Sequence, residues 1–145
     1  MKSRLLGIYL NDHLAGSVLG VELARRSLAA NEGNELGAFL RALLVEIVED
    51  RATLIQLMER LSVPRSNGKI AAAWMAERLG RLKLNGQFTG YSPLSPLVEL
   101  EGLAVGIEGK RSLWLALAQI REGDQRLLDV DLHALAERAQ TQRER

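Results

Sequence analysis

Apolar residues recur at steps of three and four throughout residues 34–62, and this periodicity constrains the fold more than any other feature of the sequence. The series consists of Leu36, Leu40, Leu43, Ile47, Leu54, Leu57 and Leu61. Steps of three and four place these side chains on one face of an α-helix, where they form a stripe. A stripe of this length has to be buried against other helices, so the segment predicts a helical bundle. Asp50 is the one charged residue within the stripe.

Clusters of Gly, Asn, Ser and Pro interrupt the chain and divide it into helices. They lie at residues 31–34, 64–68, 85–96 and 123–124. Between them, long helices are expected at residues 3–30, 34–62, 93 or 96 to 121, and within 124–145. A shorter helix is expected at residues 69–82. Val, Ile, Thr and aromatic residues nowhere alternate over the length of a strand, so the sequence predicts no sheet.

Residues that favour helix ends support these limits. Gly33 stands where a helix would end in the left-handed conformation. Asn34 is expected to cap the second long helix, and Asp131 the last one. The third long helix is expected to begin at the Ser-Pro pair of residues 92–93 or at that of 95–96, because proline is favoured in the first turn.

The connections between the helices predict the topology. Short loops join the first long helix to the second and the third to the fourth, so each pair is expected to form an antiparallel hairpin. Residues 63–92 separate the two hairpins. The second helix is on the order of 40 Å long at ~1.5 Å per residue, and this segment can return the chain along that length. The 145 residues therefore predict one all-α domain, a four-helix bundle with a long crossover.

This order of elements resembles the ferritin-like superfamily, whose four-helix bundles contain one long crossover. Metal-binding members of that superfamily use a Glu-x-x-His motif on each of two helices. Neither histidine of this chain fits the motif, since Leu10 stands three residues before His13 and Val130 three before His133. The resemblance therefore implies a ferritin-like bundle with a short extra helix in the crossover and without the standard di-iron ligands. No iron-storage, ferroxidase or oxygenase activity is carried over.

The polar residues that interrupt the apolar stripes are expected at one height in the bundle. His13 lies nearly as far before the end of the first helix at Ala30 as Asp50 lies after the start of the second at Asn34. An antiparallel hairpin places these two side by side. If the second and third helices are parallel, the same count from residue 93 reaches Gly109, within the polar stretch 108–111. The register thus predicts a polar cluster near the middle of the bundle.

Two interpretations of this cluster are compatible with the residues. The favoured one is a buried polar network without a cofactor, in which Asp50 pairs with His13 or Arg111 and Glu108 completes the set. A buried carboxylate needs partners, and an arginine suits a carboxylate but repels a metal cation. The alternative is a divergent iron or manganese site. Its candidate ligands are His13, Glu46, Asp50, Glu101 and Glu108.

Two pairs of glycines lie inside the predicted helices at a spacing of four. They are Gly16 and Gly20 in the first helix, and Gly102 and Gly106 in the third. A glycine in a helix costs ~1 kcal/mol relative to alanine, so another interaction should offset it. Close helix packing is the expected gain. The alternative is a cavity that holds a small apolar ligand.

The charge balance and the cysteine count limit the classes of partner. The chain has 19 basic and 18 acidic residues and no cysteine. A net charge of +1 gives no strong attraction to nucleic acid or to a membrane surface. The apolar run at residues 14–21 is far shorter than the ~20 residues that a membrane span needs. The absence of thiols is compatible with a reducing compartment, and the protein is expected to be cytoplasmic.

The sequence contains no motif that identifies a reaction. Two histidines and no cysteine leave nucleophilic catalysis unsupported. The apolar stretch 70–76, with Phe88 and Tyr91 nearby, would form an interface if part of it is exposed, so a homodimer is expected. We therefore expect a non-catalytic structural or interaction module. A divergent iron or manganese protein and a binder of small apolar molecules are the alternatives.

Overall fold

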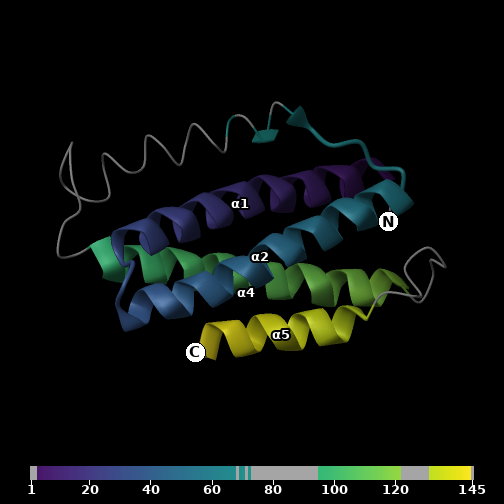
Figure 1. Cartoon of the computed structure of the whole chain (residues 1–145). Coiled ribbons are helices and arrows are strands. Elements are labelled where there is room, and N and C mark those ends of the chain that lie inside the picture. Colours follow the sequence, from purple (N-terminus) through teal and green to yellow (C-terminus); the bar gives the residue numbers. More distant parts are fainter. Residues whose placement is uncertain (1–2, 68, 71, 73–94, 122–130, 145) are drawn as a thin grey trace.

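The protein is all-α and its long helices lie side by side. The computed structural model describes residues 3–67, 69–70, 72, 95–121 and 131–144. These residues form four long helices: α1 (Ser3–Ala30), α2 (Glu35–Arg60), α4 (Ser95–Arg121) and α5 (Leu132–Glu144). Helix α1 packs against α2 and α4, and α5 packs against α4. Figure 1 shows that α2 and α4 run in the same direction, opposite to α1 and α5, as the connection lengths predict.

The caps place the helix limits close to the predicted positions. The side chain of Asn34 accepts a hydrogen bond of 2.8 Å from the backbone N–H of Gly37 and caps α2. Gly33 just before it has a φ of 88°, which confirms the left-handed ending. Asp131 accepts a hydrogen bond of 2.9 Å from the N–H of Ala134 and caps α5. Helix α4 is described from Ser95 onward, next to the later of its two predicted starts, and the earlier predicted start at residue 93 lies outside the described residues.

The predicted helix at residues 69–82 falls largely outside the residues that the structure describes. Lys69, Ile70 and Ala72 are described and have helical backbone. The apolar stretch 70–76 falls largely outside them as well, and Phe88 and Tyr91 do so entirely. The crossover helix and the homodimer therefore stay predictions.

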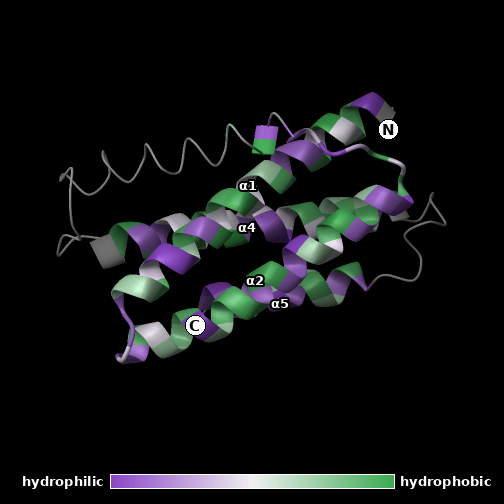
Figure 2. Ribbon diagram, turned by 45° about the horizontal axis from the view of Figure 1, so that its top comes forward, coloured by the Kyte–Doolittle hydropathy of each residue, from purple (hydrophilic) through white to green (hydrophobic). Residues whose placement is uncertain are grey.

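The buried face of α2 agrees with the predicted stripe. Its buried members are Leu40, Leu43, Ile47, Asp50, Leu54, Leu57 and, just beyond the helix, Leu61. Figure 2 shows hydrophobic and hydrophilic positions alternating around each helix, as expected where one face is buried. In α4 the buried apolar residues are Leu103, Ile107, Leu113, Trp114, Leu117 and Ala118, whereas Leu97 is exposed.

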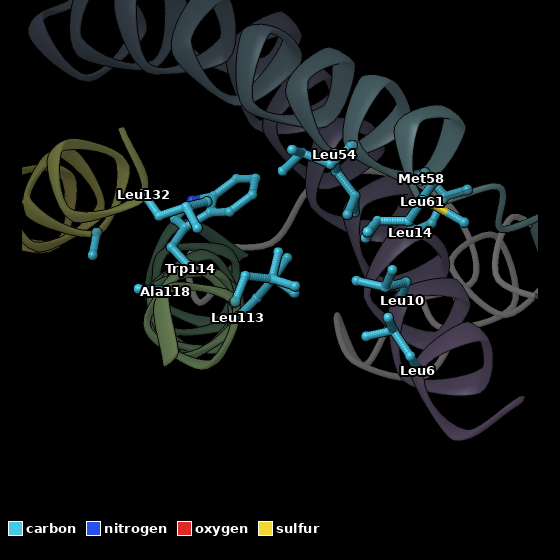
Figure 3. Close-up of a cluster of buried hydrophobic side chains, with 13 residues drawn as sticks. Leu6, Leu10, Leu14, Leu54, Met58, Leu61, Leu113, Trp114, Ala118 and Leu132 are labelled. Carbon is cyan, nitrogen blue, oxygen red and sulfur yellow. The ribbon is translucent and has the colours of Figure 1, made fainter. Parts of the chain in front are cut away.

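The buried side chains form two clusters along the helices. One gathers residues from all four long helices, including Leu10, Leu57, Trp114 and Leu132. Figure 3 shows this cluster, with Trp114 and Leu132 on one side of the view and Leu10 on the other. The second cluster contains Val21, Ala24, Leu40, Leu43, Leu103 and Ile107. No helix in the described part of the chain is both long enough and apolar enough to cross a membrane.

Candidate functional site

A cavity of about 330 Å³ lies between α1, α2 and α4. All four glycines of the two predicted pairs line it, together with Gly109. Its apolar wall comes from Leu19, Leu23, Ile47, Leu54, Leu103, Val105, Ile107, Leu113 and Trp114. Its polar residues are Asp12, His13, Ser17, Asp50, Arg51 and Lys110. The cavity is therefore apolar for most of its wall and carries a limited set of polar side chains.

Three of the four paired glycines leave this space open and do not bring the helices into close contact. A Cβ atom added at Gly16, Gly20 or Gly106 would meet no other atom within 4 Å. At Gly102 an added Cβ would lie 3.0 Å from Cδ2 of Leu23, which is a tight contact. The expected close packing is thus wrong at three of the four glycines. The space that their missing side chains leave lies along the cavity, on the walls that α1 and α4 contribute.

The cavity opens to solvent between α1 and α4. Gly16 on α1 and Gly102 and Gly106 on α4 are exposed, although they line it. Val105, also on its wall, is 74% exposed. A small molecule could therefore enter the cavity without unfolding of a helix.

Asp50 is buried in the middle of the bundle, as predicted, and belongs to a network of ion pairs. Its carboxylate is 3% exposed. Nζ of Lys110 lies 2.6 Å from Oδ2 of Asp50, and a guanidinium nitrogen of Arg138 lies 3.1 Å from Oδ1. The prediction that Asp50 pairs with His13 or Arg111 was therefore wrong. The carboxylate is instead bound by Lys110 of α4 and Arg138 of α5.

Gln142 completes this network from α5. Its Oε1 accepts a hydrogen bond of 2.5 Å from Lys110, and its Nε2 donates one of 3.0 Å to Glu46. Arg138 also donates to the backbone oxygen of Glu46, at 2.8 Å. The network therefore joins α2, α4 and α5, and it holds α5 on α2 mainly through long side chains.

Burial changes the proton affinity of the lysine in this network. The side chain of Lys110 is 16% exposed. Burial lowers its pKa below the usual value, and the neighbouring carboxylate of Asp50 opposes that change. The charges of Lys110 and Asp50 therefore balance each other in a poorly solvated place. Removing either residue would leave the charge of the other without a partner.

The remaining residues of the predicted site lie in different surroundings. His13 stacks edge-to-face with Tyr9 at a ring distance of 4.6 Å, and it lines the cavity. Burial lowers the pKa of His13, while Asp12 beside it acts in the opposite direction. Arg111 pairs with Glu108 of its own helix at 3.3 Å.

Glu46, Glu108 and Glu101 are not brought together with His13. Glu46 accepts from Gln142, and Glu108 also lies 3.4 Å from Arg143 of α5. Glu101 is exposed. Within the described residues no three His, Asp or Glu side chains are placed to share a cation. The alternative iron or manganese site is thus not formed by its candidate ligands His13, Glu46, Asp50, Glu101 and Glu108. The carboxylate of Asp50 instead forms an ion pair with the ammonium of Lys110.

Arg51 lines the cavity and was missed in the sequence. Its Nε is buried and has no hydrogen-bond partner. Its neighbour Asp50 interrupts the apolar stripe and is therefore conspicuous in the sequence, whereas an arginine one position away from a stripe is ordinary. Helix periodicity alone could not distinguish it from the exposed Arg41 on the same helix.

Arg138 and Gln142 were missed for a different reason. Lys110 lies about as far before the end of α4 at Arg121 as Gln142 lies after the start of α5 at Leu132. With Asp131 taken as the cap, a count along this antiparallel pair places Gln142 at the height of Lys110. The register of the last two helices therefore predicts that Gln142 lies level with Lys110 once the start of the last helix is known.

Comparison of the chain with protein-family models, with curated proteins and with solved structures gives no match. The ferritin-like resemblance accordingly rests on the order and direction of the helices.

Proposed function

We propose that the protein binds a small, largely apolar molecule in the cavity between α1, α2 and α4. The observation that carries this proposal is the placement of both glycine pairs on the wall of one cavity of about 330 Å³. Ligand sites in proteins are typically concave, about 300–1,000 Å³ in volume, and mostly apolar with a few polar groups. The cavity has each of these properties.

The cost of the glycines supports a role for the space. Each glycine inside a helix destabilises it by ~1 kcal/mol relative to alanine. Gly16, Gly20 and Gly106 have no close helix contact that would offset this cost. An alanine would fit at each of these positions, so packing does not require glycine there. The free volume itself is the feature that these residues provide.

The bundle supplies a rigid frame for such a site. The network around Asp50 joins α2 to α4 and α5 on one side of the cavity. The apolar clusters hold the helices together at both ends. We place this binding module in a ferritin-like bundle, a proposal supported by the parallel course of α2 and α4 (Figure 1). It acts without catalysis, in line with the sequence-based expectation.

A neutral fluorescent probe tests the proposal. N-phenylnaphthylamine emits strongly in apolar surroundings, and we expect saturable binding to the wild-type protein. The variants Gly20→Leu and Gly106→Leu fill the cavity from α1 and α4, and we expect each to weaken probe binding at least about tenfold, since the probe loses most of its buried apolar area. Ala42→Leu, on the exposed face of α2, is the matched control and should bind as the wild type does.

The variants are expected to stay folded, because leucine favours helix over glycine and enters open space. Circular dichroism and a melting curve verify this for each protein. Unchanged probe affinity in both filled variants, or no saturable signal from the wild type, would contradict the proposal.

A further inference from the structure

The charged side chains on the cavity wall are compensated with one exception. Asp12 lies 2.6 Å from Lys69. Asp50 lies 2.6 Å from Lys110. Arg51 is the fourth charged residue on the wall, and among the described residues no carboxylate forms an ion pair with it. The wall thus carries one partly exposed cation that has no ion-pair partner among the described residues.

The surroundings of Arg51 make this exception costly. Its Nε is buried from solvent and makes no hydrogen bond. A buried donor without a partner is unfavourable, and more so when it belongs to a charged group. The carboxylate next to it in sequence, that of Asp50, already accepts from Lys110 and Arg138. A partner for Arg51 therefore has to come from outside the described network.

We infer that Arg51 binds a carboxylate on the molecule that occupies the cavity, so that the ligand is a small apolar monocarboxylate. This inference rests on the proposed function, because it assigns the chemical class of the ligand of the same cavity. The guanidinium offers parallel N–H donors that match the two oxygens of a carboxylate. The glycine-lined, apolar part of the wall would hold the rest of the molecule.

The other cationic groups of the wall do not compete for the carboxylate. The ammonium of Lys110 donates to Asp50 and to Gln142. His13 has a pKa lowered by burial and is mainly neutral at pH 7. One uncompensated positive charge balances one negative charge, which favours a carboxylate over a phosphate monoester with its charge of about −1.5 to −2.

Two probes with the same apolar chain separate the head group from the chain. Octanoate carries a carboxylate, whereas octanol carries a neutral hydroxyl. Binding is measured by fluorescence of Trp114 on the cavity wall, in a Trp74→Phe background that removes the second tryptophan. We expect octanoate to bind about tenfold to a hundredfold more tightly than octanol, the range that a charge-assisted hydrogen bond supports.

Arg51→Met keeps the length of the side chain and removes its charge. We expect this variant to lose the preference for octanoate while its affinity for octanol stays within about twofold of the wild type, because the apolar wall is retained. Arg41→Met is the matched control on the same helix and should change neither affinity. A preference that survives in Arg51→Met, or an equal loss for both probes, would overturn the inference.

The neutral probe N-phenylnaphthylamine separates this inference from the proposed function. If it binds while octanoate binds no better than octanol, the carboxylate assignment is wrong and the apolar cavity still holds ligands. If neither N-phenylnaphthylamine nor the two octyl probes bind, the proposed function is wrong and the inference falls with it.

Discussion

Replacing Asp50 with alanine tests the buried network directly. The substitution leaves the ammonium of Lys110, 16% exposed, without its carboxylate. Breaking a buried ion pair by removing one partner typically costs about 3–5 kcal/mol. Two features reduce that cost here. Arg138 is 33% exposed and keeps its contacts with Glu46 and Glu49, and Lys110 keeps the oxygen of Gln142.

The lowered pKa of Lys110 reduces the cost further, because a buried lysine that loses its partner can release its proton. We therefore expect Asp50→Ala to lower the free energy of unfolding by roughly 2–4 kcal/mol. At about 3 °C per kcal/mol for a chain of this size, Tm should fall by roughly 6–12 °C. Urea titration and thermal melting, both followed by circular dichroism, measure the two quantities.

Two further variants make the test specific. Glu49→Ala removes an exposed carboxylate that also pairs with Arg138, and a surface pair contributes only about 0–1 kcal/mol. Adding Lys110→Met to Asp50→Ala removes the uncompensated charge, so the double variant should recover much of the loss. If Asp50→Ala is no less stable than Glu49→Ala, burial does not make the Asp50–Lys110 ion pair more important than a surface pair.

Three other predictions concern local features. Gly16→Ala should raise the free energy of unfolding by about 0.5–1 kcal/mol, because the new Cβ enters open space. Gly37→Ala should lower it, because the new Cβ would overlap the carbonyl oxygen of Asn31. Urea titration of both variants measures the two changes. Asn34→Ala should cost about 1 kcal/mol, and Asn34→Gly only a few tenths, in the same assay; equal losses would exclude a side-chain cap. Burial lowers the pKa of folded His13, so below about pH 6.5 the unfolded chain binds protons more readily and stability falls as the pH falls. His13→Gln should therefore make Tm depend less on pH across that range. An unchanged pH dependence of Tm would refute the assignment.

Local sequence determined the helices, their ends and the buried face of α2. Asn34, Gly33 and Asp131 act through bonds and dihedral angles within a few residues, so their roles could be read directly. The stripe of α2 could be read because a helix converts spacing into a face. The height of Asp50 followed from counting residues at a constant rise, and residues 108–111 do lie at that height, since Lys110 contacts Asp50.

Only the tertiary structure decided which side chains meet at that height. A count along two helices gives a level but not the rotation of each helix about its axis. Arg111 therefore seemed to face Asp50, although the rotation of α4 turns it toward Glu108 and brings Lys110 inward. Long cationic side chains add to the ambiguity, because Arg138 can reach the carboxylate from α5, a helix that no periodicity connects to Asp50.

The glycines show the same division. Their spacing predicts that one strip of each helix lacks side chains, but such a strip can either bring two helices together or leave a gap between them. Larger side chains also lie between α1 and α4, among them Leu23, which reaches Gly102. The cavity, with the unpartnered Nε of Arg51 on its wall, therefore depends on the packing of three helices and not on any local pattern.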